Sequence, residues 1–354
     1  VYSKTSTPAA PILWDKKNNK GICKVLIVNS GNANAHTGKQ GVKAIDTYVK
    51  KAAKVFNCQI KDILVASTGV IGEQLDFKKI LKILTYKKNR HASDLFAAAK
   101  SIMTTDTYSK TSLKKVMIGT KKISIFGFAK GSGMIFPNMA TMLAFIFIEA
   151  NISKKFLKKI LHSNLDESFN SITVDGDTST NDTLMLFSLF QESENQIIKK
   201  DEINKISLGI KTVMQDLSLQ VVCDGEGISK LIQINVINAK TYNQASDVAF
   251  SIANSQLVKT AIAGSDANWG RVIMAIGKSN LKIIQEKIKL KFGEILVAIN
   301  GKQYSKINIK KLESYMKRKK IEINIDLGIG IHNRSVLSSD LTHEYIRINA
   351  DYRS

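Results

Sequence analysis

The chain has 354 residues, of which 44% are hydrophobic and 23% charged, so it is long and apolar enough to form two packed domains or lobes and is not a disordered segment. Its three cysteines are far apart and its five histidines show no HxH or HExxH spacing, which argues against a disulfide framework and a zinc site. The net charge of +22 is typical of nucleic-acid-binding proteins, but the basic residues are 46 Lys and only 6 Arg, and nucleic-acid contacts favour Arg.

We therefore expect no nucleic-acid partner. The longest apolar runs fall short of the ~20 residues that a membrane-spanning helix needs, so we expect no membrane partner either. Unpaired cysteines fit a reducing compartment, which predicts a cytoplasmic location.

Hydrophobic periodicity in the first part of the chain predicts alternating strands and helices. The run at 24–28 is short and apolar and ends in a Ser/Gly/Asn loop, which is typical of a buried strand that leads into a polar site. The predicted strands are 24–28, 62–66, 123–128 and 143–148, and the predicted helices are 42–56, 77–84 and 94–103.

The remainder of the chain continues this mixture. The predicted helices are 154–165, 202–217, 245–256 and 269–276, and the predicted strands are 183–190, 219–223, 231–236, 288–297 and 321–325. Because helices and strands mix without a strict βαβ alternation, the pattern predicts an α+β fold of layered sheets in two lobes.

A threonine in the middle of the chain has an environment that suits self-cleavage. The stretch 130–143 runs from a glycine-rich loop into an apolar strand, with Thr141 at the junction after Ala140. A hydroxyl there is placed to attack the preceding carbonyl and cut the chain. Cleavage leaves Thr141 with a free α-amino group, whose pKa lies near ~8, beside its hydroxyl, so one residue supplies both base and nucleophile. By itself, a glycine-rich loop before an apolar strand is usually an ordinary turn, so the local pattern alone does not establish self-cleavage.

The same stretch, KGSGMIFPNMATML, resembles the cleavage-site motif of the ornithine acetyltransferase family, also called glutamate N-acetyltransferase. One such block is a weak signal, whereas an ordered series over nearly the whole chain is specific. Further blocks that resemble the family's motifs lie at 29–35, 66–72, 103–107, 173–182, 223–227, 264–271 and 347–354. On these motifs the chain is identified as a member of the family.

This resemblance implies a fold of layered sheets flanked by helices, like that of N-terminal-nucleophile hydrolases. It implies cleavage between Ala140 and Thr141 into an α chain, 1–140, with the oxyanion hole and N-terminal lobe, and a β chain, 141–354, with the nucleophile and substrate-binding lobe. Two copies of each chain are expected to assemble as α2β2. The implied reaction takes the acetyl group of N2-acetylornithine onto Thr141 and passes it to glutamate, as a step of arginine biosynthesis.

No metal or bound cofactor is expected. Some family members also use acetyl-CoA as the acetyl donor, and the residues leave that open for this chain.

Thr68 and Gly69 follow a predicted strand, and Gly69 allows close backbone approach, a pattern that by itself is usually a strand-to-loop turn. Acyl transfer needs donors for the tetrahedral oxyanion, and the resemblance implies that the Thr68 hydroxyl and the Gly69 amide are these donors. The resemblance assigns substrate binding to Lys130, whose ammonium suits an α-carboxylate, and to Thr104 or Thr105, between which the register is not settled.

The resemblance also assigns Glu226 to the side-chain amine of ornithine, and Asn349 and the terminal Ser354 to a C-terminal binding pair. Asp175, Asp177 and Asp182 resemble a cation loop but lack the spacing of an EF-hand, so we interpret them as a polar loop near the site.

The sequence departs from the family's pattern at His36, Phe136 and 332–339, and the departure at 332–339 leaves the activity level and substrate range open. Two other functions remain as alternatives. One is a related self-processing aminopeptidase or amidohydrolase, in which water accepts the acyl group. The other is an unprocessed, inactive basic binding protein.

Overall fold

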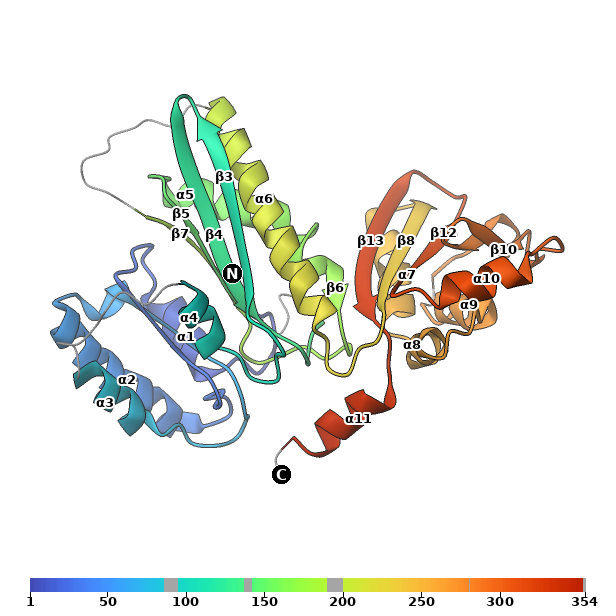
Figure 1. Ribbon diagram of the computed structural model, residues 1–354. Coiled ribbons are helices and arrows are strands. Elements are labelled where there is room, and N and C mark those ends of the chain that lie inside the picture. The colour runs from blue at the N-terminus through green and yellow to red at the C-terminus, as the bar shows by residue number, and fades with distance from the viewer. Residues whose placement is uncertain (86–94, 137–141, 190–199, 280, 353–354) are drawn as a thin grey trace. The chain divides into compact units, whose positions relative to one another are not determined.

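The computed structural model describes residues 1–85, 95–136, 142–189, 200–279 and 281–352 (Figure 1). The chain forms two compact units, of which the first comprises Val1–Asn170 and Asp177–Val221 and the second Ser171–Gly176 and Val222–Ser354. The first unit contains two sheets and the second contains one, and helices flank them, as the sequence predicts. The boundary at 221–222 is separate from the boundary predicted for self-cleavage, which lies outside the described residues.

A parallel strand pair forms one layer of the first unit. β1 (Val25–Asn29) and β2 (Ile63–Ser67) are connected by α2 (Gly38–Phe56). Every residue of β2 is buried, because Ile63 and Val65 pack into one apolar cluster and Leu64 and Ala66 into another. The first cluster also takes residues of α2, α1 (Ala10–Asn18) and α3 (Phe77–Thr85). Since parallel strands end at the same edge, the polar loops that follow β1 and β2 meet there.

A four-stranded sheet forms the next layer, in the order β3 (Lys110–Ile118), β4 (Lys121–Lys130), β5 (Leu143–Ile148) and β7 (Thr183–Ser188). Phe126, Phe147 and Phe187 stand opposite one another on β4, β5 and β7, with ring centroids 5.2 and 5.0 Å apart. The other face meets α6 (Lys200–Cys223), which runs along β3 and β4 in Figure 1. A Cβ at Gly209 of α6 would lie 2.6 Å from Ile125, so glycine permits this close packing. The shorter α4 (Leu95–Ser101) and α5 (Lys154–Leu165) complete the unit.

The second unit is built on a seven-stranded mixed sheet. Its order is β11 (Lys302–Gln303), β10 (Ile295–Ile299), β9 (Lys289–Phe292), β12 (Lys320–Asp326), β8 (Leu231–Ala239), β13 (His332–Ser339) and β6 (Ile172–Thr173). On β12 three buried isoleucines alternate with Glu322, Asn324 and Asp326, so one face of the sheet forms the core. That core also takes residues of α7 (Tyr242–Ala253), α8 (Gln256–Ala263), α9 (Trp269–Gly277) and α10 (Ile309–Met316). The last helix is α11 (His343–Ala350).

Two predicted strands are wrong. Residues 219–223 are the end of α6, because Leu217 and Val221 continue its buried face at a spacing of four residues. Residues 288–297 form the hairpin of β9 and β10 and not one strand, because Gly293 turns the chain with φ +56°. The helix predicted at 245–256 is α7, and α8 begins where that prediction ended. The sequence patterns missed α1, β3, β6, α8, β11, α10, β13 and α11.

Within the described ranges, no helix is long and apolar enough to cross a bilayer.

An aspartate is buried between α1 and β2. Asp15 has no exposed surface and accepts hydrogen bonds from the Val65 amide, at 3.0 Å, and the Tyr2 hydroxyl, at 3.3 Å. Burial disfavours the charged form and raises the pKa of Asp15 to about 8. The folded protein therefore holds this carboxyl in its neutral form up to neutral pH.

We expect Asp15→Asn to stabilise the protein progressively as the pH rises from 5 to 7.5. In this range the Asp15 carboxyl is ionised in the unfolded chain and protonated in the folded one. The free energy of unfolding of the wild-type protein therefore falls by up to about 1.4 kcal/mol per pH unit. The amide of the variant does not ionise, so the variant does not lose stability in this way. Urea unfolding at both pH values, at one protein concentration, measures the difference. Asp247→Asn on the exposed side of α7 is the control, and a difference independent of pH would contradict the assignment.

Candidate functional site

The loops that follow β1 and β2 approach each other so closely that one position requires glycine. Gly69 has φ +129°, and a Cβ there would lie 2.2 Å from the carbonyl carbon of Gly31. The Thr68 amide donates to the Asn29 carbonyl at 3.0 Å. The Gly69 amide is the next backbone donor along the chain. This edge of the parallel pair therefore presents one backbone donor beside a threonine hydroxyl.

Asn181 fixes this edge from a third segment. Its side-chain amide is buried and donates to the carbonyls of Ala33, at 2.6 Å, and Ser67, at 2.9 Å. It thus joins the loop after β1 to the end of β2. The polar stretch predicted at 173–182 contributes to the site in this way.

Lys130, the last residue of β4, lies beside Thr68. Its ammonium is almost completely buried and donates to the hydroxyls of Thr68, at 3.2 Å, and Thr104, at 2.7 Å. The structure thus brings together Thr68, Gly69, Thr104 and Lys130 from three separate segments. Thr105 is partly buried, and its hydroxyl forms no hydrogen bond within the described residues, so of the two candidate threonines Thr104 is the one at Lys130.

Sequence reasoning missed Asp106, which organises this cluster. Its carboxylate is buried and accepts from the Lys110 ammonium at 2.6 Å, the Gly131 amide at 2.7 Å and the Thr104 amide at 3.0 Å. The Lys130 ammonium lies 3.9 Å away. Burial alone would raise the pKa of Asp106, but Lys130, Lys110 and the Gly131 amide outweigh it and hold the pKa below its ordinary value. The available signal was its place in the Thr-Thr-Asp-Thr motif.

Glu226 and Asn349 lie together in the second unit. The Asn349 side-chain amide donates to Glu226 at 2.8 Å, although 123 residues separate them. Gly227 has φ +68°, and a Cβ there would lie 2.4 Å from the Tyr345 amide nitrogen. The Gly227 carbonyl accepts from the Thr342 hydroxyl at 2.6 Å. Glycine therefore allows the Glu226 turn to lie against α11.

Ala140, Thr141 and Ser354 fall outside the described residues. No group of three His, Cys, Asp or Glu side chains that would hold a metal ion occurs in the described ranges. The adjacent Thr68 hydroxyl and Gly69 amide are two donors of the kind that stabilise a carbonyl oxygen during acyl transfer. Glu226 with Asn349 is a carboxylate–amide pair that suits a substrate amine.

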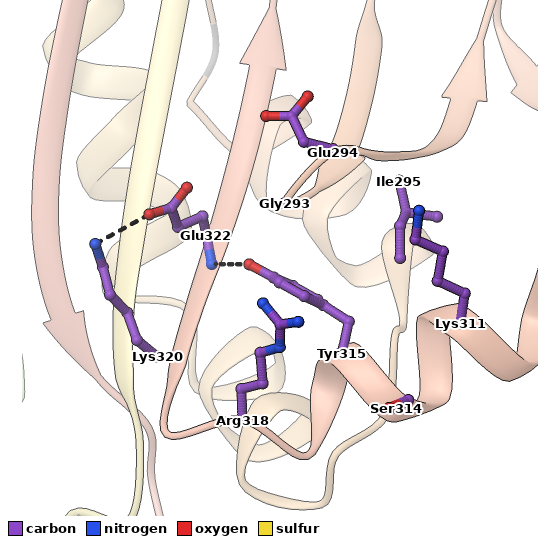
Figure 2. A pocket seen from close by; sticks show the side chains of 9 residues that line it. All are labelled: Gly293, Glu294, Ile295, Lys311, Ser314, Tyr315, Arg318, Lys320 and Glu322. Carbon is purple, nitrogen blue, oxygen red and sulfur yellow. Dashed lines mark hydrogen bonds and ion pairs between the residues drawn. The ribbon is translucent and has the colours of Figure 1, made fainter.

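A separate cavity of about 610 Å³ lies in the second unit between α10 and the sheet (Figure 2). In it Tyr315 accepts a hydrogen bond from the Glu322 amide at 2.9 Å, and Glu322 pairs with Lys320 at 3.0 Å. None of the predicted site residues lines this cavity.

Known proteins resemble the chain over its whole length. The model of the ArgJ family matches residues 1–354. The arginine biosynthesis bifunctional protein ArgJ of Bartonella henselae is 44% identical over 358 residues, which cover 100% of this chain and 87% of that protein. The proteins of the same name from Agrobacterium fabrum and Bradyrhizobium diazoefficiens are 42% and 44% identical over 361 residues, with the same coverage.

A solved structure agrees with these relatives. The crystal structure of arginine biosynthesis bifunctional protein ArgJ from Bacillus halodurans has a TM-score of 0.53 and 36% sequence identity, over 59% of this chain and 98% of that one. The layered α+β fold expected from the sequence is thereby confirmed. With a family match over every residue and relatives above 40% identity, the chain belongs to the ArgJ family.

Proposed function

We propose that this chain is an N-acetyltransferase of arginine biosynthesis that moves the acetyl group of N2-acetylornithine to glutamate through an acetyl-Thr141 intermediate. The observation that carries the proposal is the pair of adjacent donors, the Thr68 hydroxyl and the Gly69 amide, beside the buried Lys130. Such donors stabilise the oxyanion of acyl transfer. Membership of the ArgJ family supports acetyl as the acyl group, N2-acetylornithine as its donor and glutamate as its acceptor.

Self-cleavage prepares the nucleophile. The Thr141 hydroxyl attacks the Ala140 carbonyl, the peptide bond is replaced by an ester, and water hydrolyses the ester to release Thr141 with a free α-amine. Residues 1–140 and 141–354 become separate chains that we expect to remain together as α2β2.

Acetyl transfer then takes place in two half-reactions. The α-amine of Thr141 accepts the hydroxyl proton while the oxygen attacks the acetyl carbonyl of N2-acetylornithine. Thr68 and Gly69 donate to the resulting oxyanion, a contribution of about 3 kcal/mol for each donor. Collapse breaks the C–N bond, and ornithine leaves with the proton from the α-ammonium. The glutamate amine attacks acetyl-Thr141 in the same way and gives N-acetylglutamate.

Charged groups orient the substrates in this proposal. Lys130 and Thr104 contact the substrate carboxylate end, and Glu226 with Asn349 and Ser354 holds the side-chain amine of ornithine. The acetyl group travels on Thr141, so no bound cofactor is needed, and acetyl-CoA remains an alternative donor to be tested by assay. We place the reaction in the cytoplasm.

Freshly purified protein should consist of two chains. Splitting 39.1 kDa in the ratio of 140 to 214 residues gives masses of roughly 15 and roughly 24 kDa, with Thr141 at the new N-terminus. Thr141→Ala should abolish both cleavage and turnover, because it removes the hydroxyl. Denaturing mass spectrometry measures this, and residual processing in the variant would place the nucleophile elsewhere.

Ornithine release should require glutamate beyond the first turnover. An acetyltransferase holds the acetyl group on Thr141 until an amine accepts it, so N2-acetylornithine alone should give one equivalent of ornithine per active site. Acetyl-labelled substrate followed by mass spectrometry measures both products. Continuous ornithine release without glutamate would favour the amidohydrolase.

Glu226→Gln should raise KM for N2-acetylornithine about 10- to 100-fold while the chain is still cut, because a charge-assisted hydrogen bond worth about 1.5–3 kcal/mol is lost. KM for glutamate, which has no side-chain amine, should change much less. Glu313→Gln on the exposed side of α10 removes one charge from the same unit and is the control. Unchanged affinity for N2-acetylornithine would remove Glu226 from the pocket.

A further inference from the structure

The direction of the hydrogen bonds around Lys130 determines which way the Thr68 hydroxyl points. A lysine ammonium has three donors and no acceptor, so Thr68 must accept the hydrogen bond of 3.2 Å that joins them. The Thr68 hydrogen is therefore turned away from Lys130 and remains for another acceptor. Without the ammonium, the hydroxyl is able to rotate and present a lone pair to a carbonyl oxygen, which repels it.

Lys130 is itself held by buried groups. Its ammonium donates to Thr104 at 2.7 Å and lies 3.9 Å from Asp106. The Asp106 side chain has no exposed surface and is held in turn by Lys110 and by the amides of Thr104 and Gly131. The carboxylate thus connects the 104–110 segment with the end of β4.

The charges of this cluster favour an oxyanion nearby. Lys110 and Lys130 carry two positive charges and Asp106 one negative charge, so the three groups sum to +1. Because they are buried, this field is weakly screened, and negative charge that develops on a neighbouring carbonyl oxygen is stabilised.

We propose that Asp106 is a positioning residue of the oxyanion hole: it holds the Lys130 ammonium, and Lys130 directs the Thr68 O–H toward the carbonyl oxygen of the acetyl group. The inference rests on the proposed function, because Thr68 must face the reacting carbonyl. It gives Lys130 a role that is independent of any carboxylate on the substrate, and this independence makes the inference testable.

The test uses p-nitrophenyl acetate, a neutral acetyl donor with no carboxylate and no amine. Acetylation of Thr141 is followed by the release of p-nitrophenolate and by the mass of the 141–354 chain, per cut chain. In the Asp106→Asn variant the rate constant should fall about 10- to 100-fold, since a misdirected donor loses much of its effect. Glu167→Gln, which alters a lysine-paired carboxylate outside the network, should leave the rate unchanged.

A second variant guards against a folding defect. Asp106→Asn alone leaves Lys110 buried without its counter-charge, whereas Asp106→Asn with Lys110→Met removes both members of the pair. The cluster still carries +1, so any loss in this double variant comes from positioning and not from charge. The loss should be at least as large as that of Asp106→Asn, whose cluster carries +2. If a variant folds but is cut too slowly to yield mature protein, its rate of self-cleavage is compared with that of the wild-type chain.

Coupling to Thr68 separates positioning from a general structural effect. In a Thr68→Ala background the Asp106 substitution should cost less than about twofold, because the hydroxyl that it directs is gone. The inference would be overturned if the rate decreases caused by the Thr68 and Asp106 substitutions multiplied in the double variant. It would also be overturned if the Asp106 variant had a normal rate with p-nitrophenyl acetate and a raised KM only for N2-acetylornithine. If the wild-type protein forms no acetyl-Thr141, the proposed function fails first.

Discussion

The first unit's site depends on a carboxylate buried with two lysines. Removing Asp106 from water is costly, and the cost is offset only because Lys110, Lys130 and two backbone amides surround it. These contacts hold the 104–110 segment against the end of β4. The contacts of Lys130 with Thr68 and Thr104 depend on this arrangement. The same buried carboxylate therefore sets both the position of the Lys130 ammonium and the local balance of charge.

The layered packing determines where this polar cluster lies. β2 is buried on both faces, and its alternating side chains fill two clusters, which fixes the strand between a helical layer and the four-stranded sheet. Thr68 and Gly69 follow β2 directly, whereas Lys130 ends β4 in the next layer. The polar groups meet at the edge where apolar packing stops.

The sequence predicted those features that follow from local pattern. Most strands and helices show clear periodicity. A buried strand that ends in a glycine loop precedes Thr68 and Gly69, but the family resemblance was needed to assign these two residues as donors. Asp106 and Lys110 are four residues apart, and nothing in that spacing indicates burial; only tertiary packing shows that both side chains are buried. The contact of Glu226 with Asn349 spans 123 residues, so no local pattern reveals it. Residues 219–223 were misassigned because a short apolar run fits a strand or a helix end equally well.

The position of β5 has a consequence for how the protein comes apart. β5 lies between β4 and β7, and Lys130 of β4 pairs with Leu143 of β5. After a cut before Thr141, β4 and β5 would belong to two different polypeptides and would still be paired within one continuous sheet. Dilution would then not separate the folded pieces, yet unfolding would become a dissociation, with a melting temperature that rises with protein concentration. Refolding of the cut protein would require two separate chains to associate, whereas the uncut chain folds in a single molecule. The cut protein would therefore refold less readily than the precursor folds.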